Sequence, residues 1–232
     1  MPYIFDNIIM APTKSDFFLY HYLCKLSSVT SLIPDFCGEE FEVHIINIRL
    51  ASQFMRHISA SFWFAVIFTC PYLLFEAWNF VRPALYENEK KNIRLVFIFG
   101  AIMFIIGCIV GYAIVFPITL RFLASYELSS TIVNQISLDS YMDNFALLVF
   151  VMGLVFELPL ISWLLSKFGF LTKSFFGKYR RYAIVILLIL AAIITPSGDP
   201  FTLMVVFLPL YLLYEVSAFF VKADIKEPEE ES

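Results

Sequence analysis

The sequence has few of the residues that soluble enzymes use for chemistry. It contains three histidines, which lie near the N-terminus without the spacing of metal ligands: His21, His44 and His57. It has no glycine-rich phosphate loop, no HExxH motif and no GxSxG motif. Its net charge of −4 gives no basic footprint for nucleic acid. We therefore expect neither an enzyme, nor a cofactor or metal site, nor a nucleic-acid partner.

Cysteine is also scarce. Four cysteines are too few and too scattered for a disulfide framework. Cys70 and Cys108 lie in apolar runs, where we expect buried core residues. Cys24 and Cys37 share the N-terminal segment and could pair if that segment faces an oxidising compartment, but their spacing fixes no geometry.

Apolar residues, in contrast, are abundant. Hydrophobic residues make up 60% of the chain, with 27 phenylalanines and a mean hydropathy of +0.79. A soluble domain of this length cannot bury so much apolar surface, because its own surface requires many more polar residues. Lipid must therefore surround most of the chain, and the predicted fold class is an all-α membrane protein.

A helix needs about 20 apolar residues to cross a bilayer. The predicted spans are 58–81, 95–123, 144–167, 182–194 and 203–221. The span 182–194 covers roughly 20 Å against a hydrocarbon core of about 30 Å, so it must thin the bilayer or pack beneath its neighbours. Because no long internal repeat is present, we expect one polytopic bundle in a transmembrane domain over 58–221.

The basic residues predict the orientation of this bundle. They gather in the first and third connections, at Arg82, Lys90, Lys91 and Arg94, and at Lys167, Lys173, Lys178, Arg180 and Arg181. The second connection holds only Arg121, and the fourth holds none. The positive-inside rule therefore places the first and third connections and the acidic tail 222–232 in the cytoplasm.

This orientation places the segment 1–57 outside the cytoplasm, where we expect short helical elements. The segment has no basic region followed by an apolar one, so no signal peptide explains its export. We therefore expect the intact protein to have a further transmembrane helix upstream of Met1. An arm that is exported unaided is the alternative.

Four prolines fall inside or near the ends of the apolar runs: Pro71, Pro117, Pro159 and Pro209. A proline inside a helix removes one backbone hydrogen bond and kinks the helix. Four kinked spans predict a concave scaffold rather than a straight bundle. The alternative is that these prolines are ordinary, since proline is common in membrane helices.

Two carboxylates lie within the predicted spans. Glu157 is at mid-span, where an acidic residue costs about 2.5–3.5 kcal/mol and needs a partner, a proton or water. It is either a polar contact for a substrate or partner helix, or a protonated acid bonded to a carbonyl such as that of Val155, freed by Pro159. Glu215 is nearer a span end, where snorkelling to the interface is the alternative to a function.

The first cytoplasmic connection contains PALYENEKK, in which Glu87 and Glu89 precede two lysines. Such a run is usually a solvated loop with local ion pairs. A carboxylate near Phe80 and Tyr86 is also suited to binding a guanidinium group through two hydrogen bonds. The residues alone leave both interpretations open.

Other functional classes have less support. A small-solute secondary transporter usually has an internal repeat or paired broken helices with several midplane polar groups, whereas only Glu157 is clearly at mid-span. An intramembrane hydrolase would need a nucleophile and a base within the spans. A structural membrane subunit has the same composition as a receptor and remains an alternative.

Several motifs, taken in order, resemble the TatC family, the polytopic receptor subunit of the twin-arginine protein translocase. They are CPYLLFEAWNFVRPALYENEKK, GLVFELP, KYRRYAIVILLILAAIITPSGDPF and LPLYLLYE, within residues 54–220. The N-terminal FDNIIMAPTKSDFFLY resembles the first periplasmic loop of the family.

This resemblance implies six helices in a glove-like, concave structure in the cytoplasmic membrane, of which five are visible here, with both termini cytoplasmic. It implies recognition of twin-arginine signal peptides and export of folded proteins by the protonmotive force. The implied partners are those precursors, single-span subunits of the TatA and TatB type, further copies of the chain and membrane lipid.

The resemblance also implies residue roles. The signal-binding carboxylate of the PALYxxE loop falls on Glu89 and the preceding aromatic on Phe80, with Glu87 and Tyr86 beside them. The intramembrane glutamate falls on Glu157, and we add Pro159 and Glu215 as partner contacts. The acid of the last periplasmic loop falls on Asp199, although TPSGDPF has one residue more than many members. The HLxELRxR-like stretch and first helix of the family are not present in this sequence.

Overall fold

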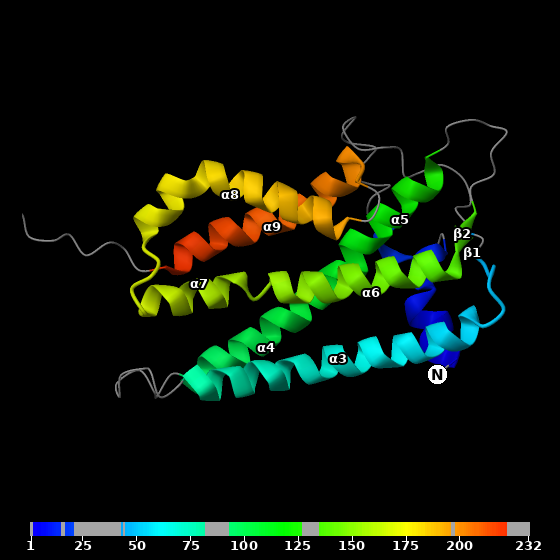
Figure 1. Cartoon of the computed structure of the whole chain (residues 1–232), viewed down its shortest axis with the longest axis horizontal. Helices are drawn as coiled ribbons and strands as arrows, with labels where there is room; N and C mark the ends of the chain where they lie inside the picture. The colour runs from blue at the N-terminus through cyan, green and yellow to red at the C-terminus, as the bar shows by residue number, and fades with distance from the viewer. Residues whose placement is uncertain are drawn as a thin grey trace, which may run out of the picture. The chain divides into compact units, whose positions relative to one another are not determined.

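The computed structural model describes residues 2–14, 17–20, 43, 45–81, 93–126, 135–195 and 198–221, which are mostly helical (Figure 1). The long helices are α3 (Ser52–Val81), α4 (Ile93–Val110), α5 (Phe116–Ser125), α6 (Leu138–Val155), α7 (Leu158–Lys167), α8 (Lys173–Ile194) and α9 (Pro200–Phe220). A π-helical turn, η5 (Gly111–Val115), joins α4 to α5. Cys24 and Cys37, whose pairing was left open, lie outside the described residues.

The described chain has four stretches that are long and apolar enough to cross a membrane. They are Ser52–Ala77, Ile98–Ser125, Leu138–Lys167 and Pro200–Phe220. The predicted class of a helical, polytopic membrane protein is confirmed. A single parallel pair of two-residue strands, β1 (Ile45–Ile46) and β2 (Ile136–Ser137), is the one sheet in the part of the chain described.

Helix α8 contains the predicted apolar span 182–194 and extends beyond it at its N-terminal end. It begins at Lys173, so it has 22 residues and a length of about 33 Å. Charged residues end an apolar run, but they do not end a helix. The segment KSFFGKYRR therefore forms the first turns of α8. The apolar part of α8 is still short, and α8 is not among the four candidate spans.

Two of the four prolines coincide with a change of helix. Pro117 lies in the first turn of α5, directly after the π-helical turn, and Pro159 lies in the first turn of α7. Proline is tolerated in a first turn because its missing N–H would have no partner there. Pro71 and Pro209 lie inside the continuous helices α3 and α9.

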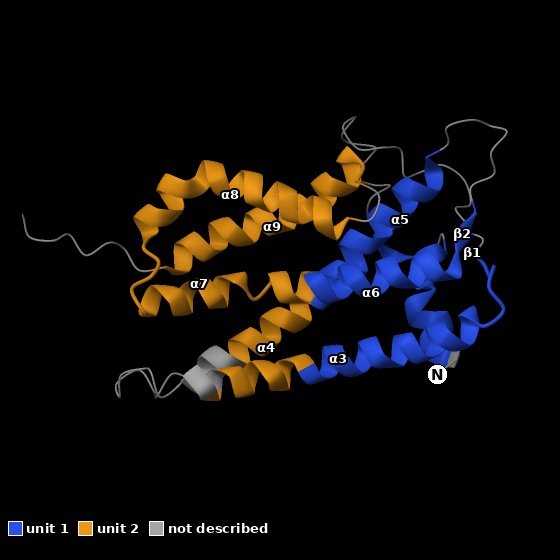
Figure 2. Ribbon diagram, viewed as in Figure 1, with its two compact units in different colours: residues 1–69, 108–151 blue, residues 70–107, 152–232 orange. Residues whose placement is uncertain are grey.

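The chain divides into two compact units, residues 1–69 with 108–151 and residues 70–107 with 152–232 (Figure 2). The boundaries fall within α3, α4 and α6, so each unit combines segments that are far apart in the sequence.

In unit 1, tyrosines fix a short N-terminal arm made of α1 (Pro2–Ile4), η1 (Phe5–Ile9) and η2 (Ala11–Thr13). The Tyr141 hydroxyl donates to the Ile9 carbonyl at 2.5 Å, and the Tyr112 hydroxyl donates to the Ile8 carbonyl at 2.8 Å. These bonds satisfy backbone carbonyls that the irregular arm cannot pair itself. They hold the arm against η5 and α6, which carry Tyr112 and Tyr141.

Two basic residues of unit 1 are engaged in packing. Arg121 is buried in α5, 4.9 Å from the centre of the Tyr20 ring, so it is not a loop charge. Burial raises the pKa of the Tyr20 phenol, which donates to the Pro12 carbonyl at 2.7 Å. Arg56 of α3 pairs with Asp139 at 2.6 Å and with Asp143, both on α6.

In unit 2, α9 packs against both α7 and α8 (Figure 1). Its inward residues Val206 and Leu210 have no exposed surface. Cys70 and Cys108, one in each unit, are buried free thiols, as predicted from their apolar runs.

Candidate functional site

The carboxylate of Glu157 is the most unusual polar group in unit 2. Glu157 joins α6 to α7, and only 2% of its surface is exposed. Neither carboxylate oxygen has a hydrogen-bond partner among the described residues. A buried polar group without a partner costs about 1–3 kcal/mol, so stability does not explain this glutamate.

Local backbone geometry leaves the Glu157 carboxylate without donors. Although Glu157 stands at the N-cap of α7, its backbone is helical, with φ −79° and ψ −11°, whereas a capping residue is normally extended. Pro159 occupies the second helical position and has no N–H to donate. The predicted alternative, in which this carboxyl bonds a backbone carbonyl, is not formed within the described chain.

Asp199 at the start of α9 shows what an ordinary cap looks like. Its backbone is extended, with ψ 148°, and its carboxylate accepts from the Thr202 N–H at 2.8 Å and the Thr202 hydroxyl at 2.6 Å. Asp199 therefore starts α9. The sequence carries this signal in DPFT, in which an N-cap residue precedes a proline at the first helical position.

Two glycines on α4 allow close approach to the helix junction that carries Glu157. A Cβ on Gly100 would lie 3.3 Å from a Glu157 carboxylate oxygen and 2.6 Å from Leu160. A Cβ on Gly107, two turns later, would lie 2.6 Å from the Met152 carbonyl oxygen. Small residues at helix contacts are a general means of packing helices in membranes. Gly100 thus lets the α4 backbone approach the Glu157 carboxylate, and Gly107 lets it approach the end of α6.

Glu215, the second carboxylate predicted in a span, has a cation partner. Arg180 of α8 binds it through two nitrogen–oxygen contacts of 2.7 and 2.5 Å. This bidentate pair joins α8 to α9. Snorkelling and a function were both open for Glu215 from the sequence, in which no local pattern pairs it with Arg180, 35 positions away.

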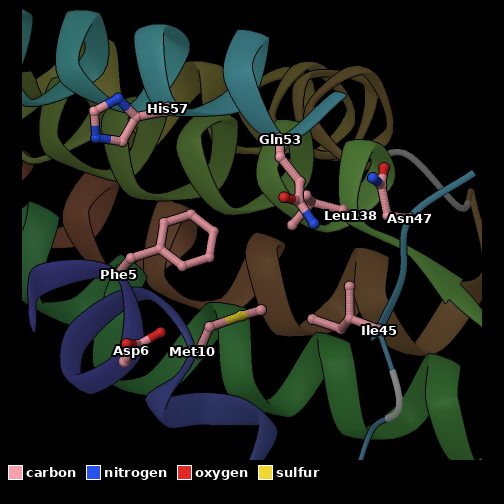
Figure 3. A pocket seen from close by; sticks show the side chains of 8 residues that line it. All are labelled: Phe5, Asp6, Met10, Ile45, Asn47, Gln53, His57 and Leu138. Carbon is pink, nitrogen blue, oxygen red and sulfur yellow. The ribbon is translucent and has the colours of Figure 1, made fainter. Parts of the chain in front are cut away.

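Unit 1 contains a cavity of about 400 Å³, which no pattern in the sequence predicts. Figure 3 shows His57 and Gln53 of α3 on one side of it, and Phe5 and Met10 of the arm on the other. Its lining residues are Phe5, Asp6, Met10, Ile45, Asn47, Gln53, His57 and Leu138. No group of three or more metal-ligating side chains occurs among the described residues, here or elsewhere.

Comparisons with known proteins connect this arrangement to a family. The family model described as "Sec-independent protein translocase protein (TatC)" matches residues 2–209. The chain belongs to the TatC family. The TatC protein of Blattabacterium sp. subsp. Periplaneta americana is 33% identical over 217 residues, covering 93% of this chain and 81% of that protein. The TatC protein of Helicobacter pylori strain 26695 is 35% identical over 190 residues, covering 82% and 74%.

Solved structures agree with this family. A crystal structure of the twin arginine translocase receptor TatC gives a TM-score of 0.68 at 28% identity, covering 92% of this chain and 91% of that one. A second TatC crystal structure, in DDM, gives a TM-score of 0.70 at 28% identity, covering 95% and 96%.

The residues that the TatC resemblance assigned to signal binding are not all placed. Tyr86, Glu87 and Glu89 lie outside the described residues. Phe80 lies in the last turn of α3, but its side chain is also outside the description. Of the predicted site residues, the structure therefore places the side chains of Glu157, Pro159, Glu215 and Asp199.

The close contact at Gly107 of this TatC protein predicts a loss of stability. We expect Gly107→Ala to lower the free energy of unfolding by about 1–3 kcal/mol, because the added methyl group meets a backbone carbonyl that cannot turn away. Gly177→Ala is the matched control. Nothing lies within 4 Å of its Cβ position in α8, so it should stabilise the helix by up to about 1 kcal/mol. Thermal unfolding of the purified proteins in detergent measures both, and equal effects would contradict the close packing.

Proposed function

We propose that this chain is the receptor component of a twin-arginine translocase. It recognises twin-arginine signal peptides and takes part in exporting folded proteins across the cytoplasmic membrane, using the protonmotive force. The observation that supports this most is the TatC match over residues 2–209, together with the similarity to a solved twin arginine translocase receptor.

The proposed orientation puts the first and third connections in the cytoplasm, where precursors are made. The exposed basic residues Lys173, Lys178 and Arg181 at the start of α8 agree with it, since cytoplasmic segments of membrane proteins are rich in Lys and Arg. The arm and the cavity of unit 1 then belong to the periplasmic side, and the C-terminus is cytoplasmic.

In this proposal the two arginines of the signal peptide dock at the first connection. Glu89 accepts a guanidinium through two charge-assisted hydrogen bonds, with Glu87 beside it. Phe80 and Tyr86 offer aromatic faces on which a guanidinium stacks. Arginine suits such a site better than lysine, whose ammonium makes no planar pair of bonds.

The intramembrane part of the proposal rests on Glu157. Its buried oxygens have no partner in the described chain, so a polar group of a single-span subunit or a precursor that displaces the α4 contact at Gly100 would satisfy them. Pro159 maintains this state by withholding a backbone donor. Glu215 is proposed as a secondary contact, because Arg180 already binds its carboxylate.

An export assay tests the receptor function. The chain is produced with single-span subunits of the same organism in cells that lack their own TatC protein. We expect a folded reporter with a twin-arginine signal to reach the periplasm, and the same reporter with twin lysine to stay in the cytoplasm. Export of both reporters alike, or uptake of a small solute without any export, would favour the transporter alternative.

A further inference from the structure

The first turns of α8 form a cationic surface that the receptor function does not use. Four basic residues lie there: Lys173, Lys178, Arg180 and Arg181. Arg180 is paired with Glu215, but the other three are exposed and make no ion pair with the described part of the chain. Their charge is therefore available to an anion.

Two of these cations begin a continuous exposed stripe along α8. At about 100° per residue, Arg181, Tyr182, Val185, Ile189 and Ile193 all fall within about 60° of Lys178 around the helix. The exposed fractions are 66% for Tyr182, 54% for Val185, 57% for Ile189 and 74% for Ile193. We call these five residues, together with Lys178, the α8 stripe.

The opposite side of α8 packs inside unit 2. Phe176, Leu187, Ala191 and Ile194 are buried, and the Phe176 ring lies 5.2 Å from that of Tyr214 on α9. Arg180 also lies on that side, which explains its contact with Glu215. The α8 stripe therefore faces away from α9.

The chemistry along the α8 stripe changes in one direction. Two cations come first, an aromatic ring with a hydroxyl follows, and three aliphatic side chains complete it. From Tyr182 to Ile193 the helix rises about 16 Å, close to half of a hydrocarbon core of about 30 Å. A phospholipid has the same order of groups, from phosphate through glycerol to acyl chain, over one leaflet.

We propose that the α8 stripe binds an anionic phospholipid. The phosphate lies between Lys178 and Arg181, the Tyr182 ring lies at the level of the glycerol, and one acyl chain follows Val185, Ile189 and Ile193.

The apolar part of the stripe identifies the source of the phosphate as a lipid. A free phosphate ion would use Lys178 and Arg181 alone and would gain nothing from Ile189 or Ile193. Each basic residue near an anionic membrane surface contributes a factor of about five in affinity.

Native mass spectrometry of the full chain in detergent tests the proposal, with phosphatidylglycerol and phosphatidylcholine of identical acyl chains as probes. We expect the wild type to retain phosphatidylglycerol preferentially. Lys178→Gln and Arg181→Gln should each weaken that retention about fivefold. Lys173→Gln removes the same charge about 140° from Lys178 and about 80° from Arg181 around the helix, outside the α8 stripe, and should leave the retention unchanged. Unchanged thermal unfolding shows that each variant is folded.

Three results would overturn the proposal. An equal loss in Lys173→Gln would show attraction to net charge rather than to the stripe. Equal retention of both lipids would show that the phosphate contacts contribute nothing. Displacement of phosphatidylglycerol by millimolar inorganic phosphate would assign the cations to a free anion instead.

Discussion

Glu157→Leu should abolish export while leaving the protein at least as stable as the wild type. Its carboxylate is buried and has no hydrogen-bond partner in the described chain, so an apolar side chain of similar size removes an unfavourable group. We expect stability to rise by about 1–3 kcal/mol, or to stay unchanged where packing offsets the gain. Export should fall to background, because the polar group offered to a partner is gone.

Two measurements on the same variant separate function from folding. Thermal unfolding in detergent gives the stability, and periplasmic reporter activity gives the export. Leu160→Met, a volume-conserving change beside Glu157, is the control. It should preserve export and change the free energy of unfolding by less than about 1.5 kcal/mol. A clear loss of stability in Glu157→Leu, matched by the loss of export, would make Glu157 a structural residue.

Crosslinking then assigns the partner. We expect Glu157→Ala to weaken association with a single-span subunit more than binding of a precursor, because the precursor docks first at the cytoplasmic connection. Stronger loss of the precursor crosslink would count against the role given to Glu157.

Much of this arrangement was accessible from the sequence, because lipid imposes simple constraints. The helical class, the burial of Cys70 and Cys108, and the unusual position of Glu157 all follow from apolar runs and the cost of a charge within them. Helix ends were less accessible. Hydropathy indicates where a segment leaves lipid, and the charged first turns of α8 lie outside the apolar run. The helix itself begins after Thr172, whose backbone is extended.

Other features could be recognised only from the three-dimensional structure. The burial of Arg121 against Tyr20 joins residues about a hundred positions apart, and no local pattern indicates it. The role of Gly107 depends on the neighbouring Met152 carbonyl rather than on its own sequence context. Asp199 is different, because its capping signal was present in the sequence and was passed over in favour of the family correspondence.

The second large effect is expected at the first cytoplasmic connection. Glu89→Gln keeps the shape of the side chain but removes the charge that binds a guanidinium group. Losing a charge-assisted hydrogen bond costs about 1.5–3 kcal/mol, so twin-arginine peptides should bind about 10- to 100-fold more weakly. Glu76→Gln on the exposed surface of α3 removes the same charge elsewhere and should leave the affinity unchanged.

The most direct test is a titration of the purified chain in detergent with a twin-arginine signal peptide and its twin-lysine counterpart. We predict that the wild type binds the arginine peptide at least about tenfold more tightly, and that Glu89→Gln no longer distinguishes the two. If Glu89→Gln bound the arginine peptide as tightly as the wild type, or if the wild type bound both peptides equally, this account of the receptor would be wrong.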